Sequence, residues 1–371
     1  MQSVAIYVGP YPYGGHWDER NLEIGHIGGS EIWAIEIANE FARRGYKVMV
    51  FGDPEEEHVT ENGVEYIKYS DFKKRNEESD GWDHIITSRR VDAIDDDIKA
   101  KDIILMCHDI LVIGCDNYDD LKLGTKIDKI CYQSLYQKLE LKDRYNIPEN
   151  KFMATYEGID MSRYSDVDKV EKKNKMLWSS GKGRGIIWLI KNVFPEIRKQ
   201  VPDFEISICG YFDDFNEPIF QQEGIKVLGN ITKDELVREQ MSSKIWIYPN
   251  HGINSVGGGV NAETFSITAI ENGVSKNALI LSDWGCWFTT LRGYEGFVGN
   301  GLFFNPMIPM DSKYWKTFAT VLSEVSIGCL QDETFRKSLA NSAYKVSKKY
   351  TWGYAADSFE NEWKELEKNR K

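Results

Sequence analysis

Residues 261–285 read NAETFSITAIENGVSKNALILSDWG, a stretch in which a helix-like pattern runs directly into a strand-like one. The apolar side chains recur on one helical face, which predicts a helix over residues 264–274. The apolar run over residues 278–282 then predicts a buried strand. A helix that leads into a buried strand is typical of α/β proteins with parallel sheets.

Two glutamates of this stretch, Glu263 and Glu271, lie eight residues apart. Positions eight apart lie on similar faces of an α-helix, so both carboxylates can point into one cleft. Carboxylate oxygens accept charge-assisted hydrogen bonds from vicinal hydroxyls, and such a pair suits a sugar and a ribose held in line. A solvated acidic face is the alternative, because the spacing of two glutamates is weak evidence by itself.

Short apolar strands alternate with helical patterns along the whole chain, which favours parallel sheets flanked by helices. With 371 residues the chain is long enough for about two domains that each bury a core. The charged run over residues 165–175 is the best linker. We therefore expect an N-terminal Rossmann-like domain over residues 1–164, joined by a C-terminal helix over 352–371, and a second Rossmann-like domain over 165–351.

The same alternation predicts individual elements. In the first half we expect a helix that Ser30 caps and Gly45 ends, an irregular or weakly stranded segment over 53–80, and strands over 4–8, 47–51, 84–87, 102–107, 129–132 and 152–155. In the second half we expect a helix over 186–197, a capping box of Thr232 and Glu235, helices after about 312, and strands over 176–178, 204–209, 226–228 and 245–248.

The formal net charge is −12, from 46 basic and 58 acidic residues. A nucleic-acid partner is disfavoured, since phosphate binding needs a basic face. An anionic membrane is disfavoured too, although a local basic patch leaves peripheral membrane contact open. Neither a signal peptide nor an apolar run of about 18 residues is readable, so we expect no transmembrane segment. Six scattered cysteines without a CxxC pair fit a reducing compartment, and we expect a cytoplasmic protein.

Five blocks of the chain, in order, resemble retaining glycosyltransferase family 4; they are residues 28–53, 106–109, 132–160, 176–210 and 261–285. The resemblance implies the GT-B fold, an α/β architecture of two doubly wound, Rossmann-like domains that face a cleft. It implies a C-terminal helix that returns to the first domain. It also implies a retaining, hexosyltransferase-like reaction that moves a sugar from a nucleotide sugar to an acceptor hydroxyl on a glycan, lipid or small molecule.

In the first domain the resemblance points to the pair Gly28 and Gly29 and to His108. The glycines precede a helix, whose N-terminal N–H groups attract anions, and Glu31 completes the family's GGxE pattern. An ordinary tight turn is the alternative, and Gly14-Gly15 is a competing pair. His108 follows an apolar strand, and the family's matching histidine stands beside the transferred sugar. A partly exposed loop histidine is the alternative.

In the second domain the loop SSGKGRG over 179–185 carries Lys182 and Arg184. Exposed N–H groups and cations in such a loop can neutralise a diphosphate leaving group. Arg184 fills the late lysine place of the family's loop, whereas Ser179 or Ser180 fills the early arginine place, so we expect Lys182 to be the substitute cation. A solvated basic turn is the alternative.

The resemblance also implies a division of roles at the donor site. Glu271 would bind the ribose hydroxyls, and Glu263 would hold the sugar together with the backbone amides of Thr264, Phe265 and Ser266. His108, Glu263 and Arg184 would then be the catalytic set. We expect no cofactor beyond the nucleotide-sugar co-substrate and no metal, because protein cations and helix dipoles can stabilise the diphosphate.

Other motifs are interpreted as structural segments or as parts of the molecular surface. Residues 156–160, YEGID, resemble the family's domain crossover, with Glu157 in place of the usual asparagine. The aspartate runs 95–97 and 213–214 could suggest a metal-binding DxD motif, but their polar context fits a solvated surface better. The glycines 257–259 either wrap the sugar or form a mobile loop.

Two other classes of protein stay open. A sugar-nucleotide epimerase with the GT-B fold would need further acid and base residues, which the sequence does not identify. A catalytically silent carbohydrate- or nucleotide-binding homologue would fit the missing early arginine and the replaced asparagine. For the enzyme, the expected partners are a nucleotide sugar and a carbohydrate or glycolipid acceptor.

Overall fold

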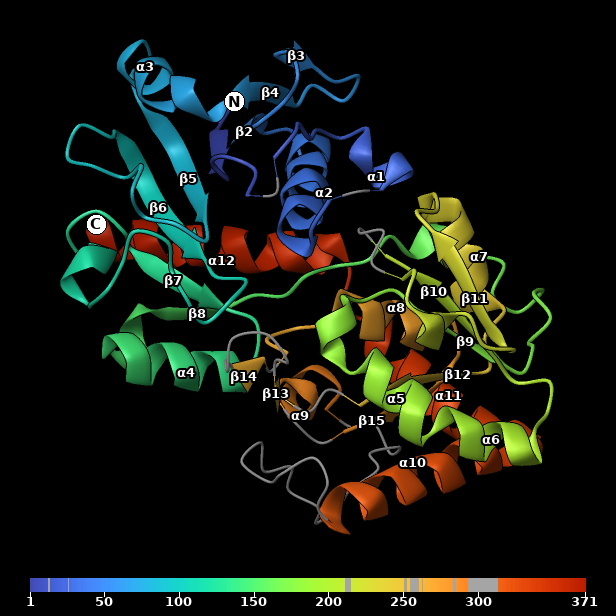
Figure 1. Cartoon of the computed structure of the whole chain (residues 1–371). Coiled ribbons are helices and arrows are strands. Elements are labelled where there is room, and N and C mark those ends of the chain that lie inside the picture. Colours follow the sequence, from blue (N-terminus) through green and yellow to red (C-terminus); the bar gives the residue numbers. More distant parts are fainter. Residues whose placement is uncertain are drawn as a thin grey trace. The chain divides into compact units, whose positions relative to one another are not determined.

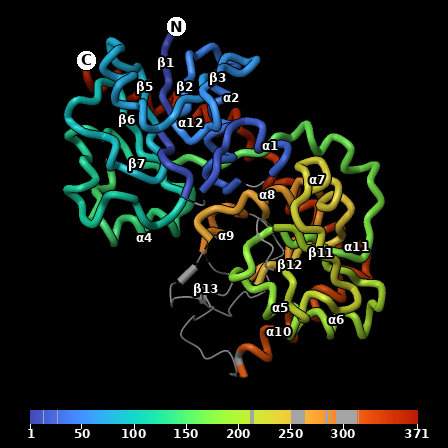
Figure 2. The backbone as a smooth tube through the Cα atoms, turned by 45° about the horizontal axis from the view of Figure 1, so that its top comes forward, coloured from blue at the N-terminus to red at the C-terminus, as the bar shows by residue number. Residues whose placement is uncertain are grey.

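In the computed structural model, the chain divides into two units. Unit 1 comprises Met1–Leu22, Ile27–Gly158 and Tyr350–Lys371, and unit 2 comprises Glu23–His26 and Ile159–Lys349. Both ends of the chain therefore belong to unit 1 (Figure 2). The structure describes the chain except for residues 13, 26, 211–214, 250–251, 254–259, 262, 283–284 and 293–312.

The sheet of unit 1 has eight strands in the order β3-β4-β2-β1-β5-β6-β7-β8. They are β1 (Ser3–Tyr7), β2 (Lys47–Gly52), β3 (His58–Val59), β4 (Glu65–Lys68), β5 (Trp82–Ser88), β6 (Ala100–Met106), β7 (Lys129–Tyr132) and β8 (Phe152–Ala154). Every neighbouring pair is parallel except β3 and β4 at one edge. The carboxyl ends of the parallel strands therefore meet at one side of the sheet, where α/β proteins bind ligands.

Both faces of this sheet are buried, as the alternation of side chains along β1 shows. Val4 and Ile6 belong to a core that also contains residues of α2 (Gly29–Arg43) and α12 (Trp352–Arg370). Ala5 belongs to a second core, with residues of α3 (Phe72–Glu77) and α4 (Leu135–Tyr145). A strand covered on both faces needs apolar residues at every position, which explains the continuous apolar run of β1. The short helix α1 (Asn21–Ile24) lies in the N-terminal loop.

The last helix, α12, returns to unit 1 and packs beside α2 (Figure 1). The rings of Phe41 and Trp363 lie 5.2 Å apart between centroids, and those of Trp33 and Phe359 lie 6.2 Å apart. Arg44 adds ion pairs with two acidic residues of α12. The predicted return of the C-terminal helix to the first domain is confirmed, because its apolar face completes the core over α2.

Unit 2 is built on five parallel strands. β10 (Glu205–Cys209) lies between β9 (Lys175–Trp178) and β11 (Ile225–Gly229), and β12 (Ile245–Tyr248) pairs with β15 (Ala278–Leu281). A bridge between Lys173 and Ser243 sets the start of β12 beside that of β9. β13 (Gly252–Ile253) and β14 (Val260–Asn261) form a short antiparallel ribbon.

Several helices of unit 2 contact one another. α10 (Lys313–Gln331) contacts α5 (Ile186–Asn192) and α6 (Phe194–Gln200). α8 (Ile267–Val274) contacts α7 (Lys233–Met241) and α11 (Glu333–Ser347). The short helix α9 (Trp287–Thr290) follows β15.

One element prediction is wrong and another is incomplete. The helix expected over residues 186–197 is two helices, α5 and α6, that meet at Val193. Pro195 has no N–H and its ring clashes with the preceding turn, so it ends one helix and begins the next. The segment 53–80, expected to be irregular or weakly stranded, contains the short strands β3 and β4, of which β4 pairs with β2, and also the helix α3, which was not expected.

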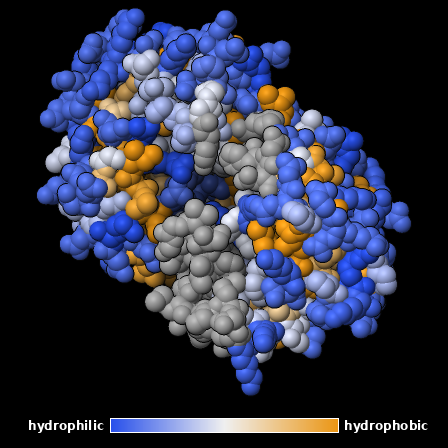
Figure 3. All heavy atoms as spheres, viewed as in Figure 1, coloured by the Kyte–Doolittle hydropathy of each residue, from blue (hydrophilic) through white to orange (hydrophobic). Residues whose placement is uncertain are grey.

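The face drawn in Figure 3 is mostly hydrophilic, with hydrophobic groups in separate patches. Within the described part of the chain, no helix is both long and apolar enough to cross a membrane. All six cysteines are free thiols. The capping box of Thr232 and Glu235, which was expected from the sequence, is present at the start of α7.

Candidate active site

The glycine pair of unit 1 lies where α2 begins, but its capping differs from the prediction. The helix starts at Gly29, and Gly28 is the N-cap residue, with φ −77° and ψ 169° and no side-chain cap. Ser30 was expected to cap this helix and does not. Its hydroxyl instead donates to Glu31 Oε2 at 3.1 Å and accepts from Arg89 at 2.9 Å. The N-terminal N–H groups of α2 are thus free of a side-chain cap from the N-cap residue.

The two competing glycine pairs serve different purposes. Gly14 and Gly15 have φ of +76° and +86°, and a Cβ at either would meet no atom within 4 Å. Glycine is therefore favoured at these positions by the backbone conformation of the turn and not by a close contact. Gly28 has an ordinary φ, but a Cβ there would lie 2.6 Å from Glu31 Oε2. A Cβ at position 28 would therefore press on the carboxylate of the buried Glu31, which favours a small residue there.

His108 follows β6 at the carboxyl side of the sheet and is buried, with 8% of its surface exposed. Its Nδ1 lies 3.2 Å from Glu157 Oε1, and its ring lies edge-on to that of Trp33, 5.2 Å between centroids. The alternative of a partly exposed loop histidine is therefore wrong. Glu157, interpreted from sequence as structural, instead contacts the predicted catalytic histidine. Its place just beyond the strand β8 was the available signal.

Gly158 keeps the structural role expected of the crossover, since a Cβ there would lie 2.4 Å from the backbone nitrogen of Trp352. Gln137, which the sequence did not single out, holds the turn that carries His108. Its buried amide donates to the carbonyls of Cys107 and Asp109 at 3.0 and 3.1 Å. The backbone on both sides of His108 is thereby anchored.

An arginine in an uncommon backbone conformation also lies at the carboxyl ends of the unit 1 strands. Arg89 follows β5 with φ +67°, in the left-handed region that non-glycine residues seldom adopt. Its guanidinium pairs with Asp109 and also donates to Ser30. The helix start of α2 and the turn after β6 are thus joined through one cation.

In unit 2, Arg184 lies in the turn Lys182–Arg184 after β9, and it meets Glu263. Arg184 Nη1 lies 2.9 Å from Glu263 Oε1, and the Tyr248 hydroxyl donates to the same oxygen at 2.6 Å. Burial, followed by the charge of Glu263, raises the pKa of Tyr248 well above its ordinary value, so the phenol stays a donor. Tyr248 was missed as a site residue, although it ends a predicted strand.

The turn itself depends on Gly185, whose φ is +106°. A Cβ there would lie 3.0 Å from the Pro249 carbonyl, so the loop after β9 passes close to the loop after β12. Lys182 points to a different partner from Arg184, because it pairs with Glu217. Its predicted role at the diphosphate therefore rests on the resemblance to the family's loop and not on a contact with Glu263.

The helix predicted over residues 264–274 begins later than expected. α8 starts at Ile267, and Ser266 caps it by accepting from the N–H of Ala269 at 3.3 Å. Glu263 and Thr264 therefore precede the helix. Glu271 lies on α8 and Glu263 does not, so the two carboxylates do not share a helical face. Glu263 is held instead by the N–H of Cys286, which donates to its carbonyl at 3.0 Å.

Glu271 is buried on α8, with 4% of its surface exposed. One carboxylate oxygen pairs with Lys233, and the other accepts from Gln240 Nε2 at 2.8 Å. Both partners come from α7, 31 or more residues away along the chain. Of the remaining predicted residues, Phe265 is buried and Thr264 is partly exposed.

Of the aspartate runs considered for metal binding, only residues 95–97 are among the described residues. Asp213-Asp214 and the glycines 257–259 lie outside the described residues. Asp95 pairs with Lys73 in a loop. Among the residues that the structure does describe, Asp18, Glu19 and His58 bring three possible ligand atoms within 4.8 Å of one another. Ion pairs of Asp18 with Arg20 and of His58 with Glu19 account for this group.

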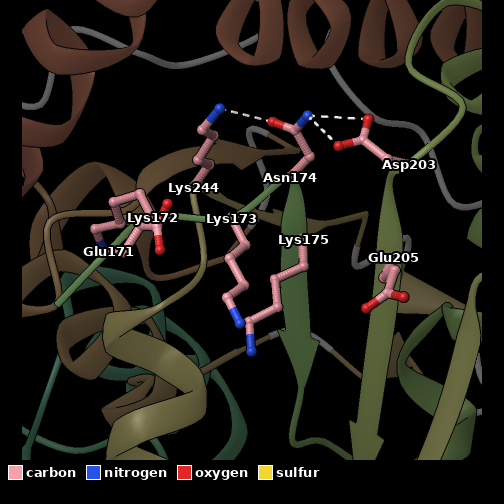
Figure 4. A pocket seen from close by; sticks show the side chains of 8 residues that line it. All are labelled: Glu171, Lys172, Lys173, Asn174, Lys175, Asp203, Glu205 and Lys244. Carbon is pink, nitrogen blue, oxygen red and sulfur yellow. Dashed lines mark hydrogen bonds between the residues drawn. The ribbon is translucent and has the colours of Figure 1, made fainter.

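A polar cavity of about 370 Å³ opens at the other side of unit 2 (Figure 4). It lies at the amino ends of β9 and β10, where Asn174 donates to Asp203 at 2.8 Å and accepts from Lys244 at 2.7 Å. The residues that line it are Glu171, Lys172, Lys173, Asn174, Lys175, Asp203, Glu205 and Lys244. Arg184 lies in the turn after the carboxyl end of β9 and Tyr248 is the last residue of β12, so both lie at the opposite ends of the strands from the cavity.

No protein-family model matches the sequence, and no curated protein matches it. Solved structures do match over nearly the whole chain. AviGT4, a glycosyltransferase involved in avilamycin A biosynthesis, has 12% identity and a TM-score of 0.69, over 99% of this chain and 98% of its own. Sucrose-phosphate synthase (tll1590) from Thermosynechococcus elongatus has 13% identity and a TM-score of 0.69, over 99% of each chain.

A third similar structure is Anabaena Alr3699/HepE in complex with UDP and glucose, with 12% identity and a TM-score of 0.64. The match covers 98% of this chain and 100% of that one. At such identities the likeness is one of fold. The α/β architecture predicted from the sequence is confirmed, and the chain has the GT-B fold.

Proposed function

We propose that this chain is a retaining glycosyltransferase that moves a sugar from a nucleotide sugar to an acceptor hydroxyl without a metal. The observation that carries the proposal is the pairing of Glu263 with Arg184, in the turn after β9, and with Tyr248, the last residue of β12. It supports the sugar-holding role of Glu263, because two donors fix one oxygen and leave the other oxygen of the carboxylate for a hydroxyl.

The remaining roles follow the resemblance. Arg184, with Lys182 and the N–H groups near Gly28 and Gly29, would stabilise the departing diphosphate. Glu271 would bind the ribose, Thr264 to Ser266 would contact the sugar, and His108 would orient it. We propose that the leaving phosphate takes the acceptor's proton, so that the new bond forms on the face from which the diphosphate leaves. The free thiols are consistent with a cytoplasmic site of action.

A screen of nucleotide sugars tests this function. A ligand at about 100 times its Kd adds about 2.7 kcal/mol of stability, which a thermal shift detects. We expect one of the UDP-, GDP-, ADP- or dTDP-sugars to raise the melting temperature in the wild type and less in Glu271→Ala. A shift of equal size in the two proteins would contradict the ribose role. No shift with any donor would contradict the glycosyltransferase.

A sugar-nucleotide epimerase with this fold is the second candidate, and one observation favours it. The buried contact of His108 with Glu157 is the kind of pair that proton transfer at a sugar carbon would use. Product analysis of the donor incubated without acceptor separates the two. An epimerised donor supports the epimerase, whereas slow hydrolysis to free sugar and nucleoside diphosphate supports the transferase.

A further inference from the structure

The amide of Gln240 connects Glu271 to the start of unit 2. Its Nε2 donates to Glu271 Oε2 at 2.8 Å, and its Oε1 accepts from the Tyr164 hydroxyl at 2.9 Å. Gln240 has no exposed surface and Tyr164 has 3%. A phenol that donates to Oε1 leaves the amide nitrogen for the carboxylate, so the orientation of the amide is determined by its two neighbours.

The tyrosine is well suited to stay the donor of this chain of bonds. Burial, with a further contribution from the charge of Glu271, raises the pKa of Tyr164 well above its ordinary value. The proton therefore remains on the phenol over the whole range in which an enzyme is assayed. The order of donors then runs from Tyr164 through Gln240 to the carboxylate of Glu271.

The backbone that carries these groups is also held by buried side chains. Asn277 Nδ2 donates to the Gln240 carbonyl at 3.0 Å and to Asn272 Oδ1 at 2.8 Å. Asn277 Oδ1 accepts from Lys172 Nζ at 2.7 Å. The C-terminal end of α8 and the end of α7 are thereby joined, so Glu271 and Gln240 keep their separation.

The carboxylate of Glu271 can still accept further hydrogen bonds after these contacts. A carboxylate offers about four lone-pair positions, and Lys233 and Gln240 take one on each oxygen. The two that remain lie in a plane that these partners determine. A pair of vicinal hydroxyls has a fixed geometry too, so the orientation of that plane decides whether both hydroxyls can donate.

We propose that Gln240 and Tyr164 are positioning residues that orient Glu271 toward the 2′- and 3′-hydroxyls of the donor, and thereby set a preference for ribonucleotides over 2′-deoxyribonucleotides. This inference rests on the proposed ribose role of Glu271. A site built to accept from a hydroxyl discriminates against the analogue that lacks it, and the discrimination is lost when the acceptor turns away.

Calorimetric titrations with a nucleoside diphosphate and its 2′-deoxy form test the proposal. The base is the one of uridine, guanosine and adenosine that gives the largest thermal shift. We expect the wild type to bind the ribonucleotide about 10- to 100-fold more tightly, in the range of a hydrogen bond to a charged group. Gln240→Met should reduce this ratio to about threefold or less, and Tyr164→Phe should reduce it in the same direction with the ring still in place.

Two comparisons make the result specific. Gln200→Met, an exposed change of the same kind on α6, should keep the wild-type ratio. Gln240→Met should change nothing further in a Glu271→Gln background, since it acts through that carboxylate. A wild type that discriminates while folded Gln240→Met and Tyr164→Phe discriminate equally well would overturn the positioning role and leave the proposed function intact. A wild type that binds both nucleotides equally would overturn the ribose role and the inference together.

Discussion

The strand ends of the two units carry similar residues but pair them differently. In unit 1 the buried His108 contacts the carboxylate of Glu157, while Arg89 pairs with the more exposed Asp109. In unit 2 the two predicted carboxylates each pair with a basic side chain, Glu263 with Arg184 and Glu271 with Lys233. Under the proposed function, the basic partners in unit 2 would exchange these ion pairs for contacts with phosphates and hydroxyls of the donor. The unit 1 edge is built to hold one side chain in a set orientation.

Arg184→Ala should have the largest effect, because it removes a cation from the unit 2 edge. Its guanidinium should stabilise charge that grows on the diphosphate, so turnover should fall by about 10²–10³ and donor affinity by much less. Steady-state transfer kinetics beside donor titrations measure both. The exposed Arg238→Ala carries the same charge change in unit 2 and should behave as the wild type. Near-normal turnover of Arg184→Ala would mean that the phosphate site lies elsewhere, and Lys182→Ala would be tested next.

Glu157→Gln tests the unit 1 edge and should have a smaller effect. The change keeps the size of the side chain and removes the charge that holds His108. A lost hydrogen bond to a charged group costs about 1.5–3 kcal/mol, so kcat should fall by about 10- to 100-fold while KM for the donor changes little. The exposed Glu149→Gln serves as control. An effect confined to KM would instead place Glu157 in substrate binding.

Lys172 extends the comparison to a basic side chain of unit 2 whose pKa is lowered. Burial, followed by the charges of Arg336 and Lys276, lowers its pKa to about 7. Between about pH 7 and the ordinary lysine value near 10.4, the unfolded chain binds the proton and the folded chain does not. The stability contributed by Lys172 should therefore rise with pH across this window and stay level below pH 7.

Urea unfolding of the wild type and Lys172→Met between pH 6 and 9 measures this slope. The wild type should gain stability relative to the variant as the pH rises. Lys169→Met, at an exposed lysine of the same segment, should show a difference that does not depend on pH. A Lys172→Met difference that is equally constant would contradict the altered titration.

The smallest effect is expected from chelation. If Arg184 and its neighbours do the electrostatic work at the unit 2 edge, transfer in excess EDTA should equal the untreated rate. The measurement is a rate before and after dialysis against the chelator. Complete loss that manganese or magnesium restores would make a metal part of the site and would direct attention to the aspartate runs.

The sequence by itself determined the kind of elements and their order. Residues 129–132 and 245–248 are strands with the bounds that the apolar pattern predicts. The capping box at Thr232 could also be read, because its two partners lie three residues apart. Such features depend on neighbours within one turn or one strand, and the helical and strand repeats make them visible in a single chain.

Only the tertiary structure decided which side chains meet. Glu263 and Glu271 were recognised, but the spacing that grouped them on one helical face was misleading, since α8 begins only at Ile267, well after Glu263. Their partners, Arg184 with Tyr248 and Lys233 with Gln240, come from other elements 15 to 79 residues away. The contact of Glu157 with His108 likewise joins the ends of two strands. Such pairs depend on how helices cross and strands align, and no local period of the sequence records that geometry.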